Sequence, residues 1–179
     1  IGCGIELNPK YYEICKERVP EFENNIFNDD CRNIDKIDLP PINYSISSPP
    51  YWDVLNRSTD GFREEREDKG LDFKYSESSK DLGNISDYDE FLKEVCSVYY
   101  KLYDKLTMGA YITIIVKNVK KEGKMYPLAW DIARILGEKY VLKDEKIWIQ
   151  DKIGLSPYGY PNSWASNILH HYCLILRKE

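Results

Sequence analysis

The residues best suited to chemistry form the segment Ser48-Pro49-Pro50-Tyr51, which directly follows an apolar, strand-like stretch at 42–47. Two successive prolines lack N–H donors and restrict the backbone, so the Ser48 hydroxyl and the carbonyls around Pro49 are held outward in one geometry. These oxygens can accept the hydrogens of an exocyclic amino group while Tyr51 stacks on a planar base, which makes the nitrogen lone pair available as a nucleophile. Ligands of open α/β sheets bind at the carboxyl ends of strands. The alternative is a proline loop that ends a strand, followed by a core aromatic residue.

Two acidic residues follow other strand-like stretches in the first part of the chain. Glu6 closes the short apolar stretch 1–7, and Asp30 follows the stretch 25–28. An ionised carboxylate only accepts hydrogen bonds, and its two oxygens can accept several, so each residue is a candidate ligand for hydroxyl or amino groups. The alternatives are an acid near a helix start for Glu6 and a polar turn for Asp30.

Strand-like and helix-like patterns alternate along the 179 residues. Short apolar or alternating stretches predict strands, and apolar residues spaced along one helix face predict helices that end at proline or glycine. The strands are expected at 1–7, 25–28, 42–47, 110–116, 140–150 and 168–177, and the helices at 9–19, 86–109 and 125–136. The alternation predicts an α/β fold with a mostly parallel sheet and a C-terminal antiparallel hairpin. We expect one domain over 1–179, which is long enough for a sizeable core.

Two irregular segments interrupt this pattern. The segment 56–84 is rich in charged residues, glycine and serine, and we predict a mobile charged insertion on the surface, since long irregular segments of compact domains are often lids or disordered. The second segment precedes the last strand and contains Tyr158, Tyr160 and Trp164. These rings are candidates for stacking on a base, with anchoring of the loop as the alternative.

Composition limits the surface and the compartment. The 25 Lys and Arg against 30 Asp and Glu give a net charge of −5, which leaves only local basic patches for nucleic acid. The best such patch consists of Lys117, Lys120, Lys121 and Lys124. The 5 cysteines lack the spacing of zinc ligands and predict reduced thiols in the cytoplasm, with no metal. No apolar run approaches the roughly 20 residues that span a bilayer, so we expect no membrane segment.

The segment Ser48-Pro49-Pro50-Tyr51-Trp52 resembles the catalytic motif of the amino-group DNA methyltransferases, which use S-adenosylmethionine to modify N4 of cytosine or N6 of adenine. The resemblance implies a Rossmann-like methyltransferase fold and a catalytic role for Ser48, Pro49, Pro50 and Tyr51. The serine form of the motif is commoner in the cytosine-N4 branch of the family. Cytosine N4 is therefore favoured as the target, with adenine N6 as the alternative.

Two further segments are similar to cofactor-binding motifs of this family. The segment 4–12 resembles the family's second strand, which implies that Glu6 accepts hydrogen bonds from the ribose hydroxyls of S-adenosylmethionine. The segment 28–32 resembles the third-strand motif, which implies that an acid, Asp30 in preference to Asp29, accepts the adenine amino group. The residues assigned to the cofactor in this way are Glu6, Leu7, Asp30, Cys31 and Ser48.

The resemblance extends to the end of the chain. The stretch 111–118 matches the strand after the catalytic one, and 170–178 resembles the family's closing strand. His170 and His171 suggest a general base, but in this chemistry the amino nitrogen attacks the sulfonium methyl directly and can lose its proton afterwards. We therefore assign no catalytic histidine.

One departure from the family pattern is large. No first strand with a Gly-rich turn precedes Glu6, so we expect an N-terminally incomplete catalytic domain, with a catalytically silent nucleic-acid-binding fragment as an alternative. An amino-group methyltransferase acting on RNA or protein is a further alternative. The expected partner is double-stranded DNA with the target base flipped out of the stack. The expected role is prokaryotic restriction-modification or an epigenetic one, and the further candidate partners are a second copy in a homodimer and a cognate restriction endonuclease encoded nearby.

Overall fold

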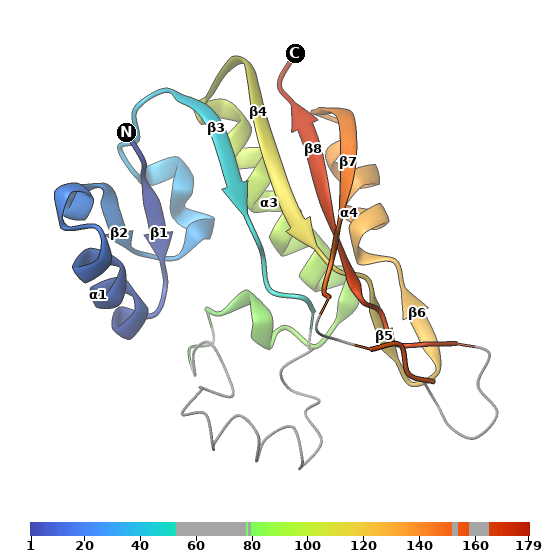
Figure 1. The fold of residues 1–179 in the computed structure, drawn as a ribbon. Coiled ribbons are helices and arrows are strands. Elements are labelled where there is room, and N and C mark those ends of the chain that lie inside the picture. The colour runs from blue at the N-terminus through green and yellow to red at the C-terminus, as the bar shows by residue number, and fades with distance from the viewer. Residues whose placement is uncertain (53–77, 79, 152–153, 158–164) are drawn as a thin grey trace. The chain divides into compact units, whose positions relative to one another are not determined.

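The computed structural model describes residues 1–52, 78, 80–151, 154–157 and 165–179. The chain divides into two compact units (Figure 1), the first formed by Ile1–Pro40 and Trp52–Lys105 and the second by Pro41–Tyr51 and Leu106–Glu179. Whether 1–179 acts as one domain stays a prediction. Most of the expected insertion 56–84, and the aromatic residues Tyr158, Tyr160 and Trp164, lie outside the described residues.

The first unit begins with a small parallel sheet and a helix. Strand β1 (Gly4–Glu6) pairs in parallel with β2 (Ile26–Asn28), and they are connected by helix α1 (Pro9–Arg18) and the 3-10 helix η1 (Pro20–Asn25). The side chain of Asn8 caps α1 by accepting a hydrogen bond from the Lys10 N–H. Pro9 suits the first helical position, because its missing N–H would have no helical partner there.

The rest of the first unit is helical. The 3-10 helices η2 (Cys31–Lys36) and η4 (Leu82–Asn84) accompany the long helix α3 (Tyr88–Lys105). Lys101 and Lys105 of α3 donate hydrogen bonds to the carbonyls of Arg32 in η2 and of Ile37, the residue that follows η2. The apolar face of α3 is buried, as expected from its spacing; its buried residues are Phe91, Leu92, Val95, Cys96, Tyr99 and Leu102.

The second unit is built on a mixed four-stranded sheet. Its order is β3-β4-β8-β7, with bounds β3 Ile42–Ser47, β4 Leu106–Val116, β8 His170–Arg177 and β7 Val141–Ile149. The β3–β4 pair is parallel, whereas β8 is antiparallel to both β4 and β7. The predicted antiparallel pairing of the last two strands is therefore confirmed.

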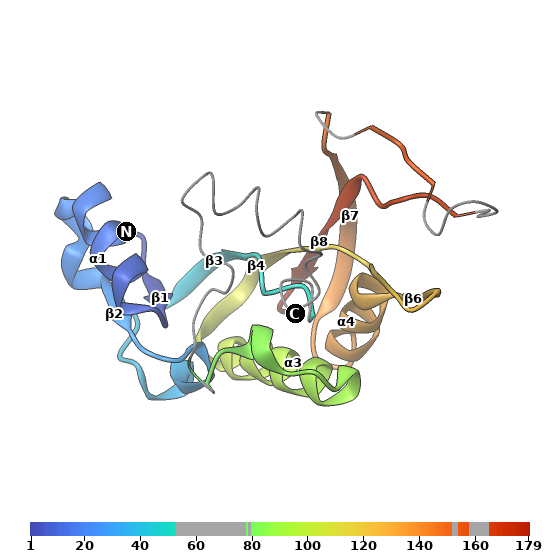
Figure 2. The same ribbon diagram turned by 90° about the horizontal axis from the view of Figure 1, so that it is seen from below.

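A hairpin and a helix complete the second unit. Strands β5 (Val119–Lys121) and β6 (Lys124–Tyr126) are joined by Glu122 and Gly123, which have φ values of 50° and 75° as a tight two-residue hairpin turn requires. Helix α4 (Leu128–Leu136) lies against one face of the sheet (Figure 2). The buried hydrophobic residues of α4, β4 and β8 are Leu128, Ala129, Ile132, Leu136, Leu106, Ala110, Ile112, Ile114, Val116, Leu174 and Leu176.

Several element bounds differ from the expected ones, and three of these differences concern the helices and the insertion. The helix expected over 86–109 ends at Lys105, because β4 already begins at Leu106. The helix expected from 125 begins only at Leu128, since Met125 and Tyr126 belong to β6 and proline at 127 restricts the residue before it. The last residues of 56–84 form η4, in which Leu82 is buried, so this end of the expected insertion is ordered.

Among the helices of the described part of the chain, none is both long and apolar enough to cross a membrane.

Candidate functional site

The segment after β3 brings the Ser48 and Tyr51 side chains together. The Ser48 Oγ and the Tyr51 hydroxyl oxygen are 3.0 Å apart and share a hydrogen bond. Ser48 is exposed, while Pro49, Pro50 and Tyr51 are half-buried. Because Pro49 and Pro50 have no backbone N–H, neither residue can donate a hydrogen bond to the hydroxyls and carbonyls of this segment. The segment therefore presents an accessible oxygen acceptor next to an aromatic ring.

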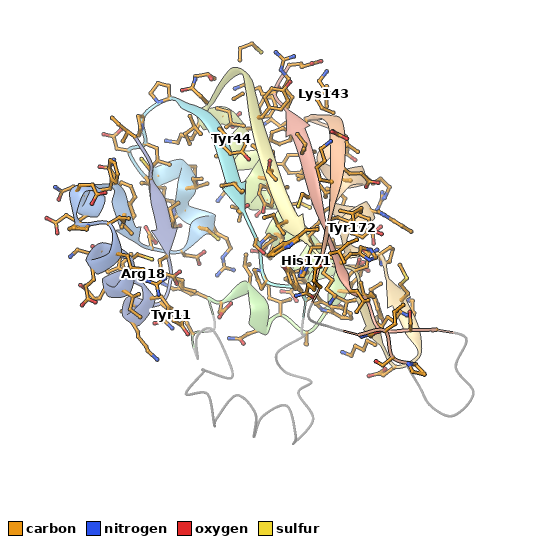
Figure 3. The ribbon with its side chains drawn as sticks, in the orientation of Figure 1. Tyr11, Arg18, Tyr44, Lys143, His171 and Tyr172 are labelled. Atoms are coloured by element: carbon orange, nitrogen blue, oxygen red, sulfur yellow. The ribbon has the colours of Figure 1, made fainter. Side chains whose placement is uncertain are left out.

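His171 packs beside this segment in the second unit. Figure 3 shows His171 next to Tyr172 at the start of β8. The ring centroid of His171 lies 5.4 Å from that of Tyr51 and 5.2 Å from that of Trp148. His171 is 6% exposed, and within the described residues its Nδ1 has no hydrogen-bond partner. Burial lowers the pKa of His171, and the nearby charges of Lys117 and His170 lower it further. The neutral imidazole is thus a flat packing surface for Tyr51, a role that the sequence analysis did not assign.

The depressed pKa of His171 predicts a pH-dependent stability. An unfolded chain takes up a proton near pH 6.5 that the folded chain resists, so the free energy of unfolding should fall as the pH drops through that value. His171→Phe keeps an aromatic ring against Tyr51 and Trp148 but does not titrate. Urea unfolding of both proteins at several pH values between 7.5 and 5.5 should show a smaller loss for the variant. Equal losses would refute this contribution of His171.

In the first unit, the carboxyl ends of β1 and β2 lie side by side. Glu6 pairs with Asn28 in the register, and the Asn28 side-chain amide donates to the carbonyls of Glu6 and Leu7 at 2.8 and 3.1 Å. One Glu6 carboxylate oxygen accepts from the Asn8 N–H at 2.8 Å. In the described structure the other Glu6 oxygen has no hydrogen-bond partner, so it is available to a ligand.

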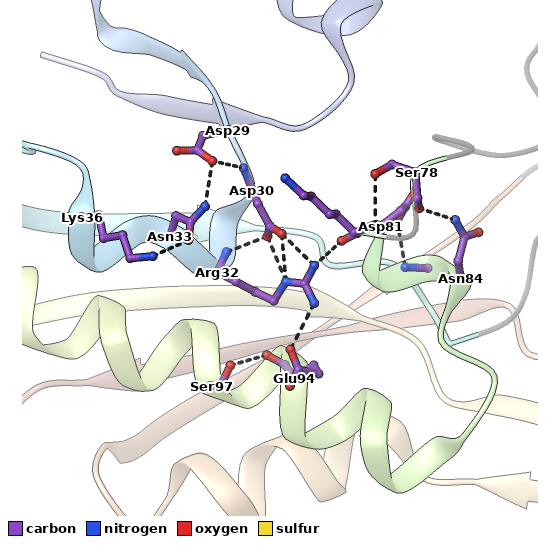
Figure 4. A network of polar contacts seen from close by, with 12 residues as sticks. Asp29, Asp30, Arg32, Asn33, Lys36, Ser78, Asp81, Asn84, Glu94 and Ser97 are labelled. Carbon is purple, nitrogen blue, oxygen red and sulfur yellow. Dashed lines mark hydrogen bonds and ion pairs between the residues drawn. The ribbon is translucent and has the colours of Figure 1, made fainter.

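Asp30 is engaged by Arg32 (Figure 4). One oxygen accepts from the Arg32 backbone N–H at 2.9 Å, and both accept from the guanidinium, the shortest contact being Oδ2 to Nη2 at 2.7 Å. Arg32 also donates to the Glu94 carboxylate and to the Lys80 carbonyl. Burial opposes ionisation of Asp30, which is 7% exposed, but the hydrogen bonds from Arg32 outweigh it and lower the pKa. Asp30 is therefore ionised and holds Arg32 in place, and its two carboxylate oxygens are largely occupied by hydrogen bonds from Arg32.

The adjacent Asp29 is less occupied. Its Oδ1 accepts from the Asn33 side chain at 2.9 Å and from the Asp30 N–H at 2.7 Å (Figure 4). These bonds, that from Asn33 first, lower the pKa of Asp29. Its Oδ2 has no hydrogen-bond partner in the residues that the structure describes. Asp29 thus has a free, charged acceptor oxygen directly after β2.

Cys31 begins η2 beside these carboxylates. Burial raises the pKa of its thiol to about 11, and the charge of Asp30 contributes. The thiol is therefore protonated at neutral pH and is no nucleophile. Within the described ranges, no group of three or more His, Cys, Asp or Glu side chains is arranged to hold a metal ion.

The structure thus groups the sequence-predicted residues in two places. The ends of β1 and β2 in the first unit hold Glu6, Leu7, Asp29, Asp30 and Cys31. The end of β3 in the second unit holds Ser48, Pro49, Pro50 and Tyr51. Sequence reasoning missed the packing role of His171, for which the only signal was the His-His pair at the start of the closing strand.

Comparisons with known proteins give structural matches only. No family model and no curated protein matches the chain. TTHA0409 of Thermus thermophilus, named as a DNA modification methylase, matches with a TM-score of 0.52 and 23% identity over 83% of this chain and 52% of its own. Its complex with S-adenosyl-L-methionine matches with a TM-score of 0.53 and 23% identity, over 83% of this chain and 53% of that one. This chain spans about half the length of TTHA0409.

A second match covers more of both chains. A Clostridium thermocellum protein named as an rRNA methylase has a TM-score of 0.53 and 11% identity, over 98% of this chain and 74% of its own. The match therefore extends over both units of this chain. The chain has the α/β fold of S-adenosylmethionine-dependent methyltransferases, as the sequence predicted.

Proposed function

We propose that this chain is the catalytic part of a methyltransferase that moves a methyl group from S-adenosylmethionine to an exocyclic amino group of a DNA base, with cytosine N4 favoured over adenine N6. The observation that carries the proposal is the accessible Ser48 hydroxyl beside the Tyr51 ring, at the carboxyl end of β3 in a methyltransferase fold. The name of TTHA0409 supports DNA, and its complex with S-adenosylmethionine supports the cofactor.

The proposed mechanism uses the geometry of the segment after β3. The target base leaves the helical stack and lies against the half-buried Tyr51 ring. The Ser48 Oγ and a nearby backbone carbonyl accept the two amino hydrogens and so orient the nitrogen lone pair away from the segment. S-adenosylmethionine supplies an electrophilic methyl group on a sulfonium centre. Because no base is needed before the attack, the neutral His171 serves as packing for Tyr51.

The residues of the first unit fit the cofactor. The free oxygen of Glu6 suits the ribose hydroxyls, as the resemblance implied. For the adenine amino group we favour Asp29 over the Asp30 chosen from the sequence, because Asp29 Oδ2 has no hydrogen-bond partner among the described residues and both Asp30 oxygens bind Arg32. In this proposal Asp30 supports the site by fixing Arg32 and the start of η2.

Asp29→Asn is expected to weaken the binding of S-adenosylmethionine about 10-fold, the effect of one lost charged hydrogen bond. The amide has the same shape, so the thermal midpoint should change little. Titration calorimetry on the full-length protein measures the affinity. Asp35→Asn removes a carboxylate from the same unit, one paired with Lys101 at 3.2 Å, and is the matched control. If Asp29→Asn binds like the wild type, the assignment of Asp29 is wrong.

The function is tested by mass spectrometry of nucleosides from the DNA of cells that express the full-length protein. We expect N4-methyl-2′-deoxycytidine in these cells and its absence with the Ser48→Ala variant. N6-methyl-2′-deoxyadenosine with the same dependence on Ser48 would keep the mechanism and change the base. Methylated bases found only in RNA would overturn the proposal of a DNA substrate.

A further inference from the structure

Lys117 lies at the edge of the sheet where the Ser48–Tyr51 segment begins. It is the first residue after β4. Ser47 pairs with Ile114 in the parallel β3–β4 register, and Pro50 and Lys117 each lie three residues farther along the chain, beyond the ends of β3 and β4. The two segments therefore leave the sheet at the same edge. Lys117 belongs to the second unit, as does the whole Ser48–Tyr51 segment.

The ammonium group of Lys117 has no counterion among the residues that the structure describes. Its side chain is half-buried, and in the described part of the chain it makes no hydrogen bond and no ion pair. Burial alone lowers its pKa. Other lysines of this unit are engaged: Lys120 donates to the Ser166 carbonyl, and Lys124 lies over the Tyr126 ring. A half-buried unpaired cation is costly, and an anion placed against it would offset that cost.

The surroundings of Lys117 connect it to the proposed base site. Val116 pairs with Tyr172 in the antiparallel β4–β8 register, which places Lys117 next to His171. The charge of Lys117 lowers the pKa of His171, and the His171 ring packs against Tyr51. The next residue, Asn118, is 3% exposed, and its Nδ2 has no hydrogen-bond partner within the described residues. Neighbouring side chains therefore connect Lys117 to Ser48, first His171 and then Tyr51, whose hydroxyl shares a hydrogen bond with Ser48.

We propose that Lys117 binds a backbone phosphate of the DNA strand that presents the target base. This inference rests on the proposed function and names a contact within it. A base stacked on Tyr51 stays covalently joined to its sugar and phosphate, so the phosphate remains within the reach of one nucleotide from this edge of the sheet. Phosphate contacts position a strand without reading its sequence, so Lys117 would hold the flipped nucleotide in register while Ser48 and Tyr51 bind the base.

The test is the salt dependence of DNA binding by the full-length protein. Fluorescence anisotropy with a labelled random-sequence duplex gives Kd between 50 and 300 mM NaCl. Lys117→Met should raise Kd about 5- to 10-fold at low salt and reduce the slope of log Kd against log salt by about 0.9, the loss of one phosphate contact. Lys117→Arg should keep the wild-type slope. Lys93→Met, which removes an exposed lysine of α3, is the control and should leave the slope unchanged.

The outcomes separate this inference from the proposed function. Methionine keeps the aliphatic stem, so Lys117→Met should fold with an unchanged or higher thermal midpoint. Wild-type slopes in Lys117→Met would overturn the phosphate contact, as would weaker binding of S-adenosylmethionine with an unchanged slope. Wild-type protein that binds DNA without methylating it would contradict the proposed function, while the slope would still decide the role of Lys117. No DNA binding by the wild type would overturn both.

Discussion

Replacing Ser48 with alanine is expected to lower the kcat of methyl transfer about 100-fold, which is the usual effect of removing one hydrogen-bonding group aimed at the reacting centre. The Ser48 hydroxyl is exposed and lies beside the Tyr51 ring, so the substitution removes an acceptor from the proposed amino-group site without opening a cavity. The KM for DNA should change much less, because stacking on Tyr51 and phosphate contacts remain. Single-turnover transfer from tritiated S-adenosylmethionine measures the chemical step directly.

The hydrogen bond between Ser48 and Tyr51 provides the control for this experiment. Tyr51→Phe removes the same hydrogen bond at 3.0 Å but leaves the Ser48 oxygen and the stacking ring in place. We expect it to lower kcat by less than about 10-fold, whereas Tyr51→Ala, which removes the ring, should also raise the KM for DNA. If Tyr51→Phe were as damaging as Ser48→Ala, the important element would be the hydrogen bond and Ser48 would not be the acceptor.

The sequence predicted the elements whose patterns are local. The strand expected at 42–47 coincides with β3, because its apolar residues are bounded by prolines on both sides. The end of α3 was predicted too late because Leu106 fits the apolar spacing of the helix as well as it fits a strand. Leu106 belongs to β4 because it pairs with Ile42, a residue distant in sequence.

The candidate site shows the same division between local and distant information. The Pro49-Pro50 pair marks the segment after β3 unambiguously, since its effect on the backbone is local. The choice between Asp29 and Asp30 depends on Arg32, whose guanidinium is held by Glu94 at a separation of 62 residues. Such a contact follows from the packing of η2 with α3, and it cannot be predicted from the residues of the motif alone.

Loss of the Asp30 carboxylate should have the largest effect on stability. Asp30→Ala would leave the Arg32 guanidinium, whose side chain is 26% exposed, without its main counterion, and would remove the cap of η2. Breaking a buried ion pair from one side costs roughly 3–5 kcal/mol, and we expect about 2–3 kcal/mol for this partly exposed pair. Urea unfolding at pH 7 measures the loss. Asp35→Ala, which breaks an exposed pair with Lys101, should cost much less.

The pH dependence of the same pair gives an independent check. The folded-state pKa of Asp30 is lowered, so its contribution to stability is complete above the unfolded pKa and is lost as the pH falls through the folded one. The wild type should therefore lose more stability between pH 5 and pH 3 than Asp30→Ala does. The double variant Asp30→Ala/Arg32→Met should recover part of the loss, because the unpaired guanidinium is gone. If Asp30→Ala were no more destabilising than Asp35→Ala, Asp30 would not be a structural anchor, and its carboxylate would again be the better candidate for the adenine amino group.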